Sequence, residues 1–211
     1  MTECVHHPLF ARFYERLARV SEGRGGAEHR RRLLAGAGGR VIELGAGSGA
    51  NFAHYPTTVS QVVAVEPESY LRARAERAAK RAPVAVSVSD GHGGRLPVET
   101  GSFDVGVASL VLCTVPDPGR ALAELFRAIR PGGELRFYEH VLANSRGEAR
   151  VQRVADATFW PRIAGGCHLA RDTRAGIERA GFEIVSCEHF AFSPARYLPP
   201  AAHILGVARR P

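Results

Sequence analysis

The sequence predicts an α/β protein with a mostly parallel sheet and helices on both of its faces. From residue 41 onward, short apolar segments typical of strands alternate with segments of helical periodicity, and this order favours a parallel, helix-covered sheet. Near the end, two apolar segments, 182–192 and 203–210, are separated only by a short connection that contains prolines. This spacing predicts an antiparallel hairpin at the end of the sheet.

The expected elements follow one another in a regular order. Pro8 to Val20 has apolar residues at steps of three and four, which predicts an amphipathic helix. The Gly- and Arg-rich stretch 21–40 is interpreted as a linker around one short helical piece. Five strands are expected within 41–44, 62–65, 84–88, 103–112 and 134–141, with helices over 72–82 and 118–130. Two more helices are expected over 149–164 and 171–181.

The length and composition limit the class of protein. A chain of 211 residues with 45% hydrophobic and 23% charged residues suits one soluble domain, whose expected parts are a helical cap and linker (1–40), a central core (41–141) and a C-terminal part (142–211). No apolar run is long enough to span a membrane and no secretory leader is seen, so we expect a cytoplasmic protein. The net charge of +7 favours anionic partners, but an Arg-rich composition explains it more simply than nucleic-acid binding.

Four cysteines, at positions 4, 113, 167 and 187, are scattered without C-x-x-C spacing. The spacing gives no support for a metal site, and none is expected. The two cysteines at 113 and 167 are interpreted as small buried residues.

The sharpest motif is the glycine-rich loop VIELGAGSGANF, residues 41–52. Gly45, Gly47 and Gly49 allow a ligand to approach the backbone closely, and the same letters fit a dinucleotide-binding loop that ends at Ala50. Glu43 favours a cationic ligand over a pyrophosphate, because its carboxylate would repel negative charge. Glu66, at the end of the next strand, is placed to accept hydrogen bonds from ribose hydroxyls.

These features together resemble class I S-adenosylmethionine-dependent methyltransferases. The resemblance is carried by the glycine loop, Glu66, the strand from Phe103 to Ser109 and the turn Arg130-Pro131-Gly132-Gly133. A closer similarity, to the methyltransferase-like thiol methyltransferases, extends over most of the chain. It includes GSGANFAHYP, SLVLCTV, FYEHV, GCHLARDT and HILGVA. The resemblance implies a Rossmann-like methyltransferase fold with a seven-stranded sheet, and S-adenosyl-L-methionine as cofactor.

The resemblance also implies roles for particular residues. Those implied to surround the methionine part of the cofactor are Glu43, Gly45, Ala46, Gly47 and Gly49. Glu66, followed by Pro67, would hold the ribose. The adenine would lie near Asp90, Gly91 or His92, and the sequence does not distinguish between these three. Ser109 and Leu110 would close the site from the other side.

The acceptor side is expected beyond the carboxyl ends of the parallel strands. His140 ends the fifth strand there, and His203 begins an antiparallel last strand at the same edge, so both are predicted to be catalytic at the acceptor. Phe10, Phe13, Tyr14, Phe159 and Trp160 are interpreted either as core or as an apolar lid. Arg171 is expected to neutralise an acidic substrate or to cap a helix.

The predicted function is methyl transfer to a small molecule, with a thiol favoured as acceptor. A thiol ionises near pH ~8.5 and needs little activation, which fits the lack of an evident acid/base cluster. The alternatives are a quinol, a phenol or a lipid amine as acceptor, or, in other classes, an NAD-dependent oxidoreductase or a non-enzymatic nucleotide-binding regulator. A monomer or a homodimer is expected, and peripheral contact with a membrane is left open.

Overall fold

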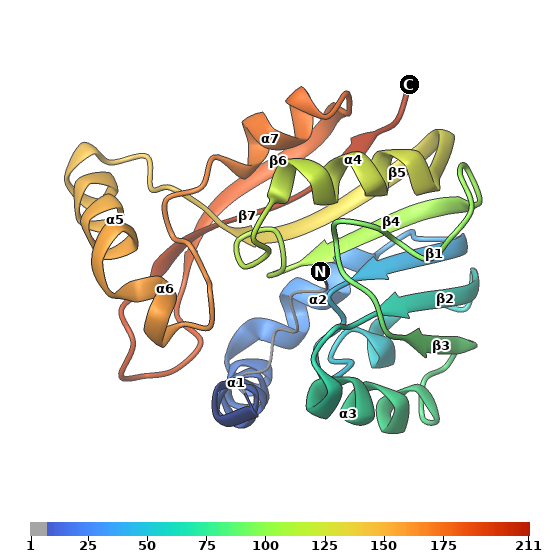
Figure 1. Ribbon diagram of the computed structural model, residues 1–211, viewed down its shortest axis with the longest axis horizontal. Coiled ribbons are helices and arrows are strands. Elements are labelled where there is room, and N and C mark those ends of the chain that lie inside the picture. The colour runs from blue at the N-terminus through green and yellow to red at the C-terminus, as the bar shows by residue number, and fades with distance from the viewer. Residues whose placement is uncertain (1–7) are drawn as a thin grey trace.

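The computed structural model describes residues 8–211, and the side chains at 8–11, 13 and 14 are outside the description. The protein is built on one seven-stranded sheet of order β3-β2-β1-β4-β5-β7-β6 (Figure 1). Its strands are β1 (Gly39–Leu44), β2 (Val59–Val65), β3 (Val86–Ser89), β4 (Phe103–Ser109), β5 (Ile129–His140), β6 (Glu183–Phe192) and β7 (Ala201–Arg209). The neighbours from β3 to β5 pair in parallel, whereas β7 pairs antiparallel with both β5 and β6. This confirms the predicted fold class, including the C-terminal hairpin.

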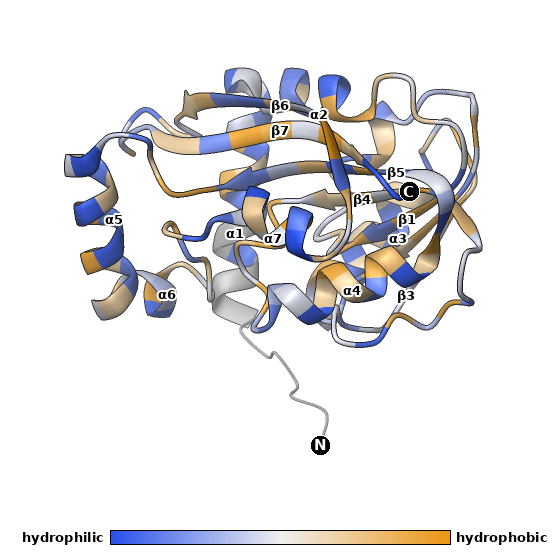
Figure 2. Cartoon of the chain, turned by 90° about the horizontal axis from the view of Figure 1, so that it is seen from above, coloured by the Kyte–Doolittle hydropathy of each residue, from blue (hydrophilic) through white to orange (hydrophobic). Residues whose placement is uncertain are grey.

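Helices cover both faces of the sheet, as the two perpendicular views show (Figures 1 and 2). The helices are α1 (Pro8–Ser21), α2 (Ala27–Leu34), α3 (Ser69–Ala79), α4 (Pro118–Ala128), α5 (Arg146–Thr158), α6 (Trp160–Ile163) and α7 (Thr173–Arg179). Two short helical turns, η1 (Glu22–Gly26) and η2 (Phe52–His54), complete the list. Among the described residues, no helix is both long enough and apolar enough to cross a membrane.

The alternation of side chains along the strands produces two hydrophobic cores, one on each face of the sheet. Ile42 of β1 packs into a core with α4 and α7, represented by Leu125 and Ile177. Its neighbour Val41 points to the other face and packs with Leu34 of α2 and Ala75 of α3. Because adjacent strand residues point to opposite faces, a continuous apolar strand such as VIEL is buried on both sides.

The segment predicted as a linker has a different structure. Residues 22–34 form η1 and α2, and the α2 residues Leu33 and Leu34 are fully buried in the core. The Gly- and Arg-rich composition wrongly suggested a flexible linker, because Gly25, with φ 117°, forms a kink between two helices. Arg30 of α2 is buried as well, with an exposed fraction of 7%.

The C-terminal helices also differ from the prediction. The single helix expected over 149–164 is divided into α5 and α6 at Phe159, and Pro161 lies at the start of α6 and not at its end. Pro is tolerated in the first turn of a helix, where the missing N–H would have no partner. The side chain of Ser145 caps α5 by accepting a hydrogen bond from the backbone N–H of Glu148. In the fold, α5 and α6 lie beyond the carboxyl ends of the parallel strands (Figure 1).

Candidate active site

The glycine-rich loop follows β1 and is held by the end of β2. The backbone N–H groups of Gly45 and Ala46 both donate to the carbonyl of Val65, at 2.8 and 3.2 Å. Gly45 has φ 66°, and a Cβ there would lie 2.3 Å from Cγ2 of Val111. Glycine is therefore required at position 45, both for backbone conformation and for the close approach of the loop after β4.

Glu66 connects the glycine loop to the end of β2. One carboxylate oxygen accepts a hydrogen bond from the N–H of Gly47 at 2.8 Å, and the other accepts one from the N–H of Glu68 at 3.0 Å. The side chain is buried, and burial raises its pKa, although the backbone N–H groups oppose that shift. Each oxygen retains a further lone pair for a ligand in the cavity that Glu66 lines.

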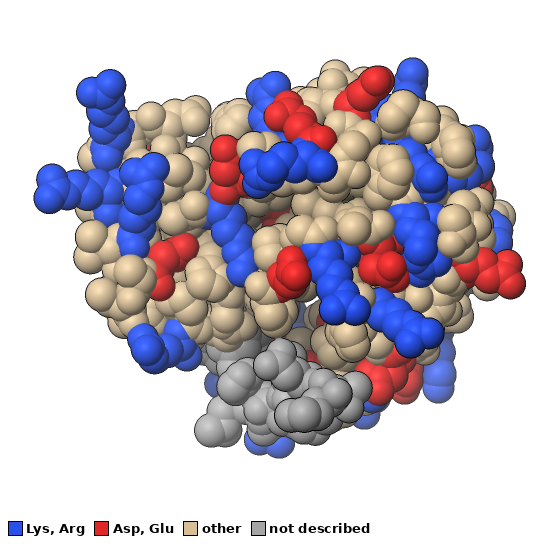
Figure 3. Space-filling view, turned by 45° about the horizontal axis from the view of Figure 1, so that its top comes forward, with Lys and Arg blue, Asp and Glu red and all other residues tan. Residues whose placement is uncertain are grey.

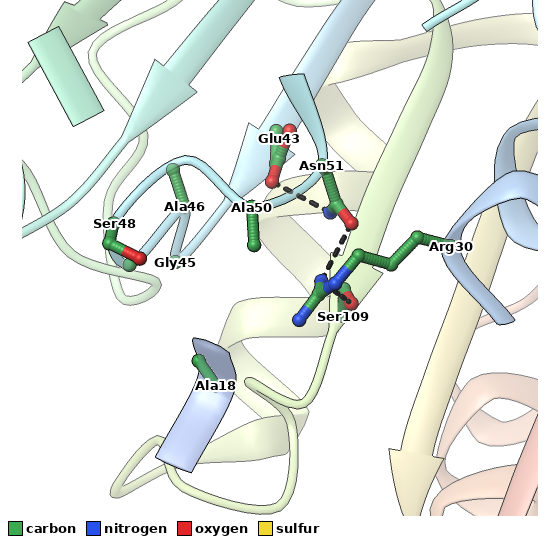
Figure 4. A pocket seen from close by; sticks show the side chains of 10 residues that line it. Ala18, Arg30, Glu43, Gly45, Ala46, Ser48, Ala50, Asn51 and Ser109 are labelled. Carbon is green, nitrogen blue, oxygen red and sulfur yellow. Dashed lines mark hydrogen bonds between the residues drawn. The ribbon is translucent and has the colours of Figure 1, made fainter. Parts of the chain in front are cut away.

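A polar pocket lies on the other side of the loop (Figure 4). It is lined by Ala18, Arg30, Glu43, Gly45, Ala46, Gly47, Ser48, Ala50, Asn51 and Ser109. Burial raises the pKa of Glu43 to about 7, even though Tyr55 and Asn51 donate hydrogen bonds to its two oxygens at 2.6 and 2.8 Å.

The arginine in this pocket was missed by the sequence analysis. Arg30 reaches from α2 and donates to Oδ1 of Asn51 at 2.7 Å and to Oγ of Ser109 at 3.3 Å (Figure 4). Its Nε atom also forms an ion pair with Glu22 at 2.8 Å. The pocket thus brings the guanidinium of Arg30 and the carboxyl group of Glu43 together around Asn51, whose side chain is hydrogen-bonded to both.

A second, larger cavity of about 2220 Å³ opens at the carboxyl edge of the sheet. Gly45, Gly47 and Glu66 line one part of it, and His140 and His203 line another. Most of the remaining wall is apolar, and α5, α6, the loop after β4 and the connection between β6 and β7 all contribute to it. Since drug-sized ligands fill roughly 300–1,000 Å³, this cavity has room for a cofactor and an acceptor together.

The structure separates the predicted cofactor residues into groups. Those lining one cavity or the other are Glu43, Gly45, Ala46, Gly47, Glu66, Pro67, His92, Ser109 and Leu110. Asp90 lines neither; its side chain is 73% exposed and pairs with Arg72 at 3.0 Å. Gly49 also lines neither cavity. A Cβ there would lie less than 3.0 Å from Phe52 and Ala78, so glycine at this position allows close packing.

The two predicted catalytic histidines lie side by side. The strand register pairs His140 directly with His203, and their rings are 4.3 Å apart between centroids. His203 is buried, and burial together with the nearby His140 lowers its pKa to about 3. Burial acts on His140 in the same direction, but its hydrogen bond with Cys167 and the charges of Cys167 and Glu139 outweigh it and raise the pKa.

Two cysteines complete this part of the wall. Nδ1 of His140 lies 3.5 Å from Sγ of Cys167 and 3.8 Å from Sγ of Cys113. A hydrogen bond from Cys113 lowers the pKa of Cys167, and the same contact raises the pKa of Cys113. Both cysteines are buried, as predicted, but their contact with His140 could not be predicted, because the three residues come from the loop after β4, the end of β5 and the loop after α6.

Two other predicted contributors have different outcomes. Arg171 donates hydrogen bonds to the carbonyls of Leu112 and Val115, so its structural role is to hold the loop after β4 and not to cap a helix. Of the proposed aromatic lid, Trp160 lines the cavity whereas Phe159 is 54% exposed. The side chains of Phe10, Phe13 and Tyr14 lie outside the described residues.

Comparisons with known proteins identify the class first. The methyltransferase domain family matches residues 42–137, which include the glycine loop, Glu66 and the loop after β4 that lines the large cavity. Among solved structures, an S-adenosylmethionine-dependent methyltransferase of Thermotoga maritima, described as a possible histamine N-methyltransferase, superposes with a TM-score of 0.70. It covers 96% of this chain at 20% identity, with 98% of its own chain matched, which establishes the shared fold. The protein is an S-adenosylmethionine-dependent methyltransferase.

The particular family follows from relatives of higher identity. Thiol S-methyltransferase TMT1B of Mus musculus is 39% identical over 181 residues, which are 83% of this chain and 73% of the relative. Thiol S-methyltransferase TMT1A of Homo sapiens is 35% identical over 185 residues, again 83% of this chain and 73% of the relative. The chain therefore belongs to the methyltransferase family that includes these two proteins.

Proposed function

We propose that the protein methylates a small-molecule thiol inside the large cavity. The observation that carries this proposal is that one cavity contains both the glycine loop with Glu66 and the apolar wall with His140. A thiol and the methyl donor can then meet in one cavity. The names of the relatives, thiol S-methyltransferases, support the same acceptor class.

The cofactor half of the proposal assigns S-adenosyl-L-methionine to the two pockets that share the glycine loop. Glu66 accepts hydrogen bonds from the ribose hydroxyls, and Pro67 and His92 lie along the same wall. Gly45, Ala46 and Gly47 border both the ribose and the amino-acid part, which lies towards Glu43 and Ser109. Arg30 faces the carboxylate of that amino-acid group, and Glu43 faces its ammonium.

The fit is supported by the shape of the loop. The backbone at Gly45 and Gly47 has φ 66° and 56°, conformations that favour glycine and that bend the loop sharply along the wall of the cavity. The cavity also holds Glu66 beside the loop, and the names of the relatives favour a sulfonium nucleoside over a dinucleotide as its ligand.

Catalysis by these residues consists mainly of alignment and exclusion of water. When bound, the cofactor supplies a methyl group that is already activated by a positively charged sulfur, so the protein does not need to create an electrophile. The glycine loop and Glu66 fix one reactant, and the apolar wall under α5 and α6 confines the other. His140 and His203 border the acceptor, where a side chain that takes or screens the thiol proton increases the fraction of thiolate.

The direct test is product detection. The purified protein is incubated with S-adenosylmethionine and a panel of thiols, phenols, quinols and amines, and the products are identified by mass. We expect methyl thioethers from alkyl and aryl thiols, with a rate that rises with pH until the thiolate is fully formed. A panel in which thiols give no thioether while a quinol or an amine is methylated would overturn the thiol assignment and leave the methyltransferase class intact.

A lipid amine is a second candidate acceptor, favoured by the rim of the cavity. Val151 of α5 and Ile163 of α6 line the cavity yet are 69% and 60% exposed. Arg150, Arg153 and Arg162 are exposed on the same two helices, and Figure 3 shows basic side chains projecting from that end of the molecule. An apolar rim with surrounding cations suits an amphiphile that carries an anionic group. Including a phosphatidylethanolamine micelle in the panel tests this candidate with the same readout.

A further inference from the structure

Three side chains with metal-binding atoms meet in the wall of the acceptor cavity. Cys113, His140 and Cys167 each present one such atom, and these atoms all lie within 4.8 Å of one another. They come from the loop after β4, the end of β5 and the loop after α6. All three residues line the large cavity, so the cluster forms part of its wall, with Cys113 and Cys167 buried there.

The distances within the cluster suit a single tetrahedral ion. With Zn–S bonds of about 2.3 Å and Zn–N bonds of about 2.0 Å, two ligands at the tetrahedral angle lie about 3.5 to 3.8 Å apart. Nδ1 of His140 is 3.5 Å from Sγ of Cys167 and 3.8 Å from Sγ of Cys113. Binding therefore needs only small side-chain movements.

The backbone around the cluster is held firmly. Glu139 accepts hydrogen bonds from the N–H groups of residues 111, 112 and 113, at 2.9 to 3.0 Å. The N–H of His168 donates to the carbonyl of Cys113 at 2.7 Å and so joins the two cysteine loops directly. A metal site is most effective when its ligands are fixed in this way before the ion arrives, because little ordering is left to be done.

We propose that Cys113, His140 and Cys167 bind a thiophilic divalent cation, Zn²⁺ being the expected ion, with its fourth position open to the acceptor cavity. Two thiolates and one imidazole form a donor set typical of zinc, and three protein ligands with an open position are the arrangement of catalytic zinc sites. A structural zinc site would have a fourth protein ligand, and none of the described residues adds one to this cluster.

The cation would act on the acceptor that the proposed function assigns, and the chemistry rests on that function. An acceptor thiol that binds the open position loses its proton to water, since a coordinating thiol is deprotonated outright. The sulfur of this thiolate then forms a bond to the methyl carbon, while the bond from that carbon to the sulfonium sulfur breaks. The electron pair of the broken bond stays on the cofactor sulfur, which becomes a neutral thioether. In this interpretation His140 acts by holding the cation and not by taking the proton.

Cobalt binding tests the site without any turnover. The chain is reduced, freed of metal with a chelator and titrated with Co²⁺, whose absorption reports both thiolate ligation and tetrahedral geometry. Zn²⁺ affinity is then measured by displacement of Co²⁺. We expect one ion per chain in the unaltered protein. The variants Cys113→Ser, Cys167→Ser and His140→Gln should each lower the affinity at least ~10²-fold, since even outer partners of metal ligands are worth 10- to 100-fold.

Matched controls separate a lost ligand from a lost fold. Cys187→Ser, in β6 and outside the cluster, should leave the Co²⁺ spectrum unchanged. Each variant is also checked for its melting temperature and for binding of S-adenosylhomocysteine, so that a misfolded variant is recognised. Binding that is absent, or that survives all three cluster substitutions, overturns the proposal.

A final experiment distinguishes an error in the proposed metal site from an error in the proposed function. A thiol acceptor added to the Co²⁺ protein should shift its spectrum, as expected for a thiolate in the fourth position. Methylation of thiols by the metal-free protein at an undiminished rate would overturn the role of the cation while leaving thiol methylation established. If the Co²⁺ spectrum does not respond to any thiol that the enzyme methylates, the assignment of an open fourth position is overturned.

Discussion

The two halves of the large cavity are built in different ways. The cofactor half is built mainly from β1, the glycine loop and the end of β2, which follow one another in the chain and are joined by the hydrogen bond from the N–H of Gly47 to Glu66. The acceptor half is assembled from loops after β4, β5 and α6 and from the β6–β7 connection. The comparison teaches that one half of the site is specified by a local motif, whereas the other depends on tertiary packing. Four predictions test that difference.

The largest expected effect lies in the acceptor half. We expect His140→Gln to lower kcat/KM for a thiol about 10²-fold while the affinity for S-adenosylmethionine stays unchanged, because His140 borders the acceptor and not the glycine loop. His203→Gln should cost less, since burial lowers the pKa of His203 to about 3 and makes it a weak proton acceptor. Steady-state kinetics and calorimetric titration with cofactor measure both quantities. Equal losses in cofactor affinity would mean that the two halves are not independent.

In the cofactor half, Glu66→Gln should show the opposite pattern. The amide keeps the size of the side chain but loses charge-assisted hydrogen bonds, which predicts roughly tenfold weaker binding of S-adenosylmethionine. The value of kcat at saturating cofactor should change little. Glu99→Gln, at an exposed position, serves as the control in the same calorimetric titration. Unchanged cofactor affinity in the Glu66 variant would remove Glu66 from the ribose role.

Glu43 predicts a pH dependence of stability. Its pKa is raised by burial from 4.5 to about 7, so between these pH values the folded protein binds more protons than the unfolded chain. The free energy of unfolding should therefore fall as pH rises from about 4.5 to 7, and the contribution is constant above that window. Urea unfolding at several pH values measures the slope. Glu43→Gln should flatten it, and an identical slope in both proteins would show that Glu43 ionises normally.

The smallest effect concerns the adenine edge. His92 lines the cavity, whereas Asp90 lies outside it and pairs with Arg72. We therefore expect His92→Ala to weaken cofactor binding several-fold and Asp90→Asn to weaken it less than about twofold, since exposed ion pairs contribute little. Competition between adenosine and S-adenosylmethionine for each variant shows whether the loss of affinity comes from contacts with the nucleoside. A larger loss in the Asp90 variant would restore Asp90 as the adenine contact.

Local signals could be predicted from the sequence, whereas contacts that only the fold creates could not. The fold and the glycine loop were predictable because apolar strand patterns and glycines needed for positive φ are local signals. Arg30 was missed because it lies in a segment whose Gly and Arg content is typical of linkers, and only the fold brings it to Asn51. The contact of Cys113 and Cys167 with His140 was not predicted either, because no spacing rule relates two loop residues to the end of a distant strand.

The central claim is that the methyl donor and the thiol share one cavity. A crystal structure with S-adenosylhomocysteine and an aryl thiol tests it most directly. The account predicts the nucleoside between Glu66 and the glycine loop, and the thiol sulfur between the cofactor sulfur and the wall formed by His140. A thiol bound outside this cavity, or a nucleoside bound away from Glu66, would contradict it.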